Sequence, residues 1–142
     1  MLVSQILRSK GDTVFTTRPT ETVAEVAALL HARGVGALVV LDSDRVVGIV
    51  SERDIVRAVA EQGQAALARP VSDFMTANVL FAEPGETVDG LLGRMTDRRI
   101  RHLPVCRSER LVGIVSIGDL VKSKISEVEA EADGLKAYIA AS

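Results

Sequence analysis

One long segment of this chain occurs twice. GIVSERDIV at 48–56 returns as GIVSIGDLV at 113–121, so that Gly48 and Gly113 lie 65 positions apart. The same spacing holds without a gap over residues 14–59 and relates further pairs: Val14 and Val79, Pro19 and Pro84, Thr22 and Thr87, Val23 and Val88, Ser51 and Ser116, and Asp54 and Asp119. A repeat of this length, present twice, predicts a duplicated supersecondary unit rather than a solenoid.

The repeat also sets the predicted boundaries. VSQIL at 3–7 resembles VSDFM at 71–75 with a spacing of 68, which leaves about three extra residues near 9–12 in the first copy. We expect a loop there. The predicted division is 1–68 for the first repeat with its N-terminal segment, 69–124 for the second repeat, and 125–142 for a C-terminal helix.

Each copy predicts the order β-α-β-β-α. Thr22 and Glu25 form a capping box, apolar residues follow at helical spacing, and Gly34 supplies a stop, which predicts a helix. GALVVL at 36–41 and RVVGIVS at 45–51 are β-branched runs separated by turn residues, which predicts a hairpin, and a helix begins at Ser51. The second copy predicts a helix at 88–98, strands at 102–106 and 110–116, and a helix from Ile117. The fold class is therefore mixed α/β.

Composition excludes several classes of protein. Aromatic residues make up 3%, Trp is absent and the net charge is −2, which disfavours a nucleic-acid binder. The longest apolar run, 35–41, is too short to span a membrane, and no signal peptide is recognisable, so a cytoplasmic location is expected. Two histidines and the single Cys106 predict neither a metal site nor a disulfide, and no serine lies in a nucleophile motif, so no enzyme is expected.

The motifs carry a resemblance to a known family. Both G-I-V-S-x-x-D elements and RIRHLPV at 99–105 resemble a tandem cystathionine-β-synthase-type (CBS) domain pair, or Bateman module, of the stand-alone bacterial type. The resemblance covers about 3–124. It implies a pseudo-twofold pair of three-stranded sheets whose clefts between the repeats bind adenosine-containing ligands such as AMP, ADP, ATP, S-adenosylmethionine or a dinucleotide. It also implies a regulatory role.

The Ser-x-x-Asp pairs, Ser51 with Asp54 and Ser116 with Asp119, permit two interpretations. The spacing is that of a helix N-cap with an acid in the first turn. However, Asp is shorter than the Glu that a capping box favours, and it recurs although the intervening residues differ completely. A carboxylate at a helix N-terminus can accept hydrogen bonds from a ribose diol. We expect ligand contact together with capping.

A nucleotide also needs cations, and here the two copies differ. Arg101 and His102 precede the LPV strand, where the resemblance places phosphate contacts, whereas their counterparts Gly36 and Ala37 carry no charge and permit close backbone approach. Arg53 is a candidate replacement cation in the first copy. The predicted ligand-binding residues are Gly36, Ala37, Ser51, Arg53, Asp54, Arg101, His102, Pro104, Ser116, Ile117 and Asp119.

The C-terminal residues form an apolar stripe at coiled-coil spacing: Val121, Ile125, Val128, Ala132, Leu135 and Ile139. Either this stripe packs on its own domain or it packs on a second copy of the chain. A CBS pair needs no such helix to close its core, so we expect a homodimer, with Leu2, Ile6 and Leu7 contributing to the contact.

Two functions follow from these observations. The first is a stand-alone sensor that binds an adenosine nucleotide, such as AMP or ATP, in the clefts between the repeats and regulates an unknown protein partner. The second is a dimeric interaction scaffold that needs no ligand. The acids at Asp54 and Asp119 favour the sensor, because a scaffold would tolerate other residues there.

Overall fold

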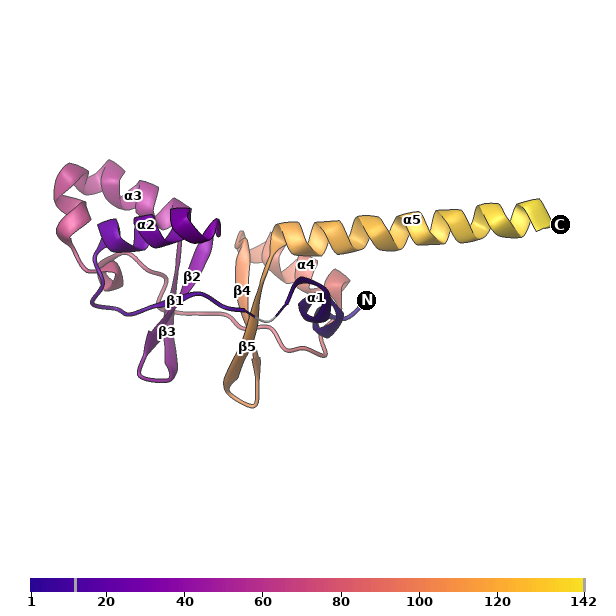
Figure 1. Ribbon diagram of the computed structural model, residues 1–142, viewed down its shortest axis with the longest axis horizontal. Coiled ribbons are helices and arrows are strands. Elements are labelled where there is room, and N and C mark those ends of the chain that lie inside the picture. The colour runs from indigo at the N-terminus through magenta and orange to yellow at the C-terminus, as the bar shows by residue number, and fades with distance from the viewer. Residues whose placement is uncertain (12, 142) are drawn as a thin grey trace. The chain divides into compact units, whose positions relative to one another are not determined.

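The N-terminal segment packs with the second repeat rather than the first. The computed structural model describes residues 1–11 and 13–141 and divides into two compact units (Figure 1). The first-repeat unit is Thr13–Leu80, and the second-repeat unit joins Met1–Asp12 to Phe81–Ser142. Residues 69–80 therefore belong with the first repeat. The predicted boundary at 68, with the N-terminal segment in the first repeat, does not match these units.

The first-repeat unit follows the predicted order of elements. Its sheet has the strand order β1-β2-β3, with β1 parallel to β2 and β2 antiparallel to β3. Helix α3 follows β3 without a loop. The elements are β1 (Thr16–Thr17), α2 (Val23–Arg33), β2 (Ala37–Asp42), β3 (Arg45–Ser51), α3 (Glu52–Gln62) and the 3-10 helices η1 (Gly63–Ala68) and η2 (Val71–Asp73).

Helix α2 begins and ends where the sequence predicts. The Glu25 N–H donates to Thr22 Oγ1 at 3.1 Å and the Thr22 N–H donates to Glu25 Oε2 at 3.1 Å, which completes the capping box. Gly34 ends the helix in the left-handed region with φ 63°. Its counterpart after α4 is Arg99, which adopts φ 54° although it has a side chain.

Among the described residues, the second-repeat unit has one strand fewer. Strands β4 (His102–Arg107) and β5 (Arg110–Ser116) pair antiparallel, and α4 (Val88–Arg98) and α5 (Ile117–Ala141) flank them in sequence. The third strand that the resemblance implies is reduced to a single parallel bridge between Ala82 and Val105.

Pro104 gives the physical reason for the missing strand. In the first repeat, the Val39 N–H donates to the Phe15 carbonyl at 3.4 Å and extends the β1–β2 ladder. Pro104 occupies the position equivalent to Val39 and has no N–H to donate. Only the bonds around Ala82 remain, from Ala82 N–H to the Pro104 carbonyl and from Cys106 N–H to the Ala82 carbonyl, both at 2.9 Å.

The segment that precedes each repeat in sequence packs with the other repeat: residues 1–12 belong to the second-repeat unit and residues 69–80 to the first. A glycine in each motif makes room for this exchanged packing. Leu7, on α1 (Val3–Lys10), packs over Gly113 of β5, where an added Cβ would lie 2.6 Å from Leu7 Cδ2. Met75 covers Gly48 of β3 in the same way, and an added Cβ there would lie 3.0 Å from the Thr76 carbonyl oxygen. The glycine of each G-I-V-S-x-x-D motif is therefore required by close packing.

Helix α1 corrects two predictions. It extends through Ser9 and Lys10, so these residues are helical and the predicted loop is wrong there; Asp12 lies outside the described residues. Ile6 and Leu7 are 6% and 9% exposed, because α1 packs within the second-repeat unit. They are therefore not available for the dimer contact predicted for them, whereas Leu2 is 39% exposed.

Helix α5 is one continuous helix from the end of β5 to Ala141, and it extends beyond the other elements of its unit (Figure 1). Residues 128–141 are all exposed. The apolar stripe therefore does not pack on its own domain along this length: Val128 is 49% exposed and Leu135 60%.

Candidate functional site

The first Ser-x-x-Asp pair is a buried capping box. Asp54 is 6% exposed, and its Oδ2 accepts from the Ser51 N–H at 2.9 Å, while the Asp54 N–H donates to Ser51 Oγ at 3.3 Å. Arg57 donates from Nη2 to Asp54 Oδ1 at 3.0 Å and to the Phe74 carbonyl at 3.0 Å. Both carboxylate oxygens are therefore engaged by protein groups.

The second pair has the same cap but a more exposed carboxylate. Asp119 Oδ2 accepts from the Ser116 N–H at 2.8 Å, and the Asp119 N–H donates to Ser116 Oγ at 3.1 Å. The Asp119 side chain is 24% exposed. Its cationic partner is Lys10, whose Nζ lies 2.6 Å from Asp119 Oδ2 and 3.0 Å from the Ile114 carbonyl oxygen.

One step of the sequence argument is wrong. Asp was expected to be a less favoured reach-back residue than Glu because it is shorter, yet both Asp side chains accept from the N–H of their N-cap serine. The reach is possible because each serine has an extended backbone at a strand end, which directs its N–H toward the first helical turn. The acid at this position is therefore explained by capping in both repeats.

The strand entries lie beside these caps. The Glu52 N–H donates to the Gly36 carbonyl at 3.0 Å, and the Ile117 N–H donates to the Arg101 carbonyl at 2.7 Å. Across the strands, Ala37 pairs with Ser51 and His102 with Ser116. The structure thus brings most of the predicted residues of each repeat to the cap in its own unit, whereas Pro104 lies further along β4, opposite Ile114.

The predicted residues differ in how accessible they are. Arg53 and Arg101 are exposed, and Gly36, Ser51, His102, Ser116 and Ile117 are half-buried. Ala37 and Pro104 are buried, and the Pro104 carbonyl accepts from Ala82. Whether these residues contact a ligand stays a prediction.

Sequence reasoning missed both cationic partners. Arg53 was predicted as a phosphate contact, which stays a prediction, whereas the ion-pair partner of Asp54 itself is Arg57, about one turn further along α3. The spacing of three residues was a readable signal. Lys10 lies 109 positions from Asp119 in sequence, and only the exchanged position of α1 brings the two together.

The environment of Asp119 favours its charged form. Burial acts to raise the pKa of this carboxyl, but hydrogen bonds from Lys10 and the Ser116 N–H, together with the charge of Lys10, outweigh burial and lower the pKa below its ordinary value. Asp119 is therefore a carboxylate at neutral pH and can accept hydrogen bonds from hydroxyl groups.

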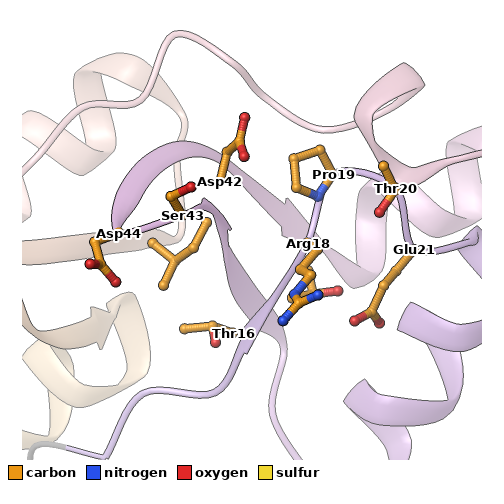
Figure 2. A pocket seen from close by; sticks show the side chains of 10 residues that line it. Thr16, Arg18, Pro19, Thr20, Glu21, Asp42, Ser43 and Asp44 are labelled. Carbon is orange, nitrogen blue, oxygen red and sulfur yellow. The ribbon is translucent and has the colours of Figure 1, made fainter.

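A hollow in the first-repeat unit, away from both caps, has a lining rich in acidic residues. Figure 2 shows it between β1 with the residues that follow and the turn between β2 and β3. Its volume is about 760 Å³. Its lining includes three acids, Glu21, Asp42 and Asp44, and one cation, Arg18. None of the predicted site residues lines it, and its excess of negative charge does not suit a phosphate. The volume of this hollow is therefore not an argument for a nucleotide site.

Two negative findings apply to the described residues alone. Within 1–11 and 13–141, no group of three or more His, Cys, Asp and Glu side chains is placed to hold a metal ion. In the same residues, no helix has the length and apolar character needed to cross a bilayer.

The fold and the paired caps define a class of protein, a duplicated α/β module. In each repeat a strand ends at the serine of the Ser-x-x-Asp motif, and the aspartate lies in the first turn of the helix that follows. The CBS domain family model matches twice, at residues 3–61 and 71–126. The chain belongs to the CBS-domain family, and its fold is that of a CBS domain pair.

Known relatives extend over most of the chain. A CBS-domain containing protein from Agrobacterium tumefaciens is 46% identical, with a TM-score of 0.86 over 87% of this chain and 99% of that one. The CBS domain-containing protein YhcV of Bacillus subtilis is 32% identical over 82% of this chain and 83% of its own. The CBS domain pair of protein MJ0100, solved in complex with 5′-methylthioadenosine and S-adenosyl-L-methionine, is 28% identical, with a TM-score of 0.79 over 89% of this chain and 98% of that one.

Proposed function

We propose that this chain is a regulatory module that binds an adenosine-containing ligand, with Asp119 as the main ribose contact. The supporting observation is that the MJ0100 domain pair, which shares this fold, is solved with two adenosine-containing ligands. Asp119 offers a charged carboxylate, partly open to solvent, at the N-terminus of α5. Arg101, His102 and Ser116 lie beside it as contacts for a phosphate.

The two repeats are not equivalent in this proposal. Asp54 is buried and bonded to Arg57, so its carboxylate is less available to a ligand than the carboxylate of Asp119 is. Gly36, Ala37, Ser51 and Arg53 stay predicted contacts of a second ligand. The position of any ligand between the repeats, a cytoplasmic location and a regulated protein partner also stay predictions from the sequence, as does the absence of catalysis.

Calorimetric titration of the full chain with AMP, ATP, NADH and S-adenosylmethionine tests this function. Losing a charge-assisted hydrogen bond corresponds to about 1.5–3 kcal/mol, so Asp119→Ala should weaken binding roughly 10- to 150-fold. Asp89→Ala is the matched control, because Asp89 is an exposed acid of the same unit that pairs with Lys124. The absence of heat with all four ligands would favour the ligand-independent scaffold instead.

We also propose that the chain forms a homodimer through the apolar stripe of α5. Val121, Ile125, Val128, Leu135 and Ile139 are each between 44% and 64% exposed, and they share one helix face at coiled-coil spacing. A contiguous apolar face of this kind is typical of an interaction surface. A second copy of the same helix presents the complementary face.

Truncation after Lys124 tests the dimer by multi-angle light scattering. The full chain should have twice the monomer mass of 15.1 kDa, and the truncated chain should be monomeric at the same concentration. A full chain that is monomeric, or a truncated chain that dimerises equally well, would exclude the stripe as the dimer contact.

A further inference from the structure

Lys10 is the partner of Asp119, although it belongs to neither motif. It is the last residue of α1, and its side chain is 34% exposed, so the ion pair lies at the surface of the second-repeat unit rather than in its core. The same ammonium group bonds the Ile114 carbonyl. Its contacts therefore hold the ammonium beside the carboxylate while leaving both groups accessible to water.

The first repeat has a different arrangement. Arg57 reaches Asp54 from within the same helix, and its second bond to Phe74 holds it in place against a buried carboxylate. Lys10 comes from a separate helix and meets a carboxylate that is open to solvent. An exposed lysine pair of this kind contributes little to stability, so it can be exchanged for another partner at low cost.

A second cation, Lys122, lines the same cavity as the pair. This cavity has a volume of about 280 Å³, and Ser9, Ser123 and Ser126 are also among its lining residues. Lys122 and Ser123 follow Asp119 by three and four residues, which places them on the same face of α5. Ammonium and hydroxyl groups that surround one cavity can donate to an anionic group.

The position of Lys10 conflicts with a bound ribose. A diol that bonds both oxygens of Asp119 needs Oδ2, and Oδ2 is the atom that Lys10 contacts. Because Oδ2 already accepts from the Ser116 N–H and from Lys10, a ribose hydroxyl competes with the ammonium group for this oxygen. An uncharged nucleoside leaves the displaced ammonium with no new anion, whereas a nucleotide supplies one.

We propose that Lys10 exchanges Asp119 for the phosphate of the bound ligand, so that this site selects phosphate-bearing adenosine nucleotides over uncharged adenosine. The inference rests on the proposed function and adds to it a specificity-determining residue. Lys10 is then a phosphate contact in addition to Arg101 and His102. Before binding, it neutralises the carboxylate that will hold the ribose.

The test compares AMP with adenosine by calorimetry on the full chain. The wild type should bind AMP more tightly than adenosine. Lys10→Met keeps the length and apolar character of the side chain but removes its charge; it should weaken AMP binding about 3- to 10-fold and leave adenosine binding equal or tighter. Lys10→Arg keeps the charge and should keep the preference for AMP.

Lys124→Met is the control for a lost positive charge. Lys124 lies on α5, the helix that contains Asp119, but it pairs with Asp89 rather than with Asp119. It should leave the ratio of the two affinities unchanged. If Lys10→Met also leaves that ratio unchanged, the inference is overturned, including the case in which both ligands bind equally more weakly. If the wild type binds neither AMP nor adenosine, the inference is overturned, and titration with ATP, NADH and S-adenosylmethionine then shows separately whether the proposed function stands.

Discussion

Asp54→Ala should destabilise the protein far more than the equivalent change in the second repeat. The substitution removes a negative charge from the first turn of α3, where its interaction with the helix dipole is worth about 0.3–1 kcal/mol. It also leaves the Ser51 N–H without its partner in a half-buried position, at about 1–3 kcal/mol. Arg57 is 48% exposed, so its lost ion pair adds at most about 1 kcal/mol. Because these contributions overlap, we expect a total of about 2–4 kcal/mol.

Urea unfolding followed by far-UV circular dichroism measures this loss. With a slope near 2 kcal/mol per molar urea, the midpoint should fall by roughly 1–2 M. Asp119→Ala loses the same kind of cap, but its side chain is 24% exposed and water can reach the freed N–H, so a fall of about 0.5 M is expected. Asp54→Asn keeps an acceptor for the Ser51 N–H and should lie between the wild type and Asp54→Ala.

A contrary result would reassign the first acid. If Asp54→Ala lowers the midpoint no more than Asp119→Ala does and yet abolishes nucleotide binding, then Asp54 acts mainly on a ligand. The structural role inferred from its burial and from Arg57 would then be wrong.

Two further predictions concern the second-repeat unit. Because the folded pKa of Asp119 is lowered, its contribution to stability is complete above the unfolded value of about 3.9 and is lost as pH falls through the folded value. The urea midpoint should therefore fall less steeply below about pH 4 in Lys10→Met than in the wild type, and equal slopes would show that Lys10 does not lower this pKa. Arg99→Gly should raise the midpoint, because Arg99 adopts φ 54° at a cost of about 1–2 kcal/mol that glycine avoids in part. A lower midpoint would show that the Arg99 side chain stabilises the unit by another contact.

The sequence predicts local structure well because the signals for it are local. The cap at Thr22, the stop at Gly34 and the β-branched runs lie within or next to the elements they define, and the helices at 23–33 and 88–98 and the four hairpin strands begin and end within a residue of the predicted positions. Helix α1 and the two 3-10 helices were not predicted, and α5 continues without a break into the separate C-terminal helix predicted at 125–142. The reduced third strand was also readable, because Pro104 visibly lacks the N–H that Val39 uses.

The unpredicted parts depend on contacts between distant segments. The repeat spacing aligns 3–7 with 71–75, but it does not state which strand each segment will cover. The exchange puts Leu7 on Gly113 and, with it, Lys10 on Asp119. Arg57 lies three residues after Asp54 on the same helix, a spacing that permits an ion pair, but it falls outside the repeated motif.

The exchanged position of α1 has a consequence for the order in which the chain folds during synthesis. The first-repeat unit, Thr13–Leu80, is continuous in sequence and can fold as soon as it is made. Helix α1 is made before it but must wait for β5 and α5, because 109 positions separate Lys10 from Asp119. Closing a loop of that length costs roughly 4 kcal/mol of chain entropy, against which the burial of Val3, Ile6 and Leu7 acts. Helix α1 therefore leaves the ribosome before the first-repeat unit but reaches its native contacts after it, and the Lys10–Asp119 pair forms only once α5 has been made.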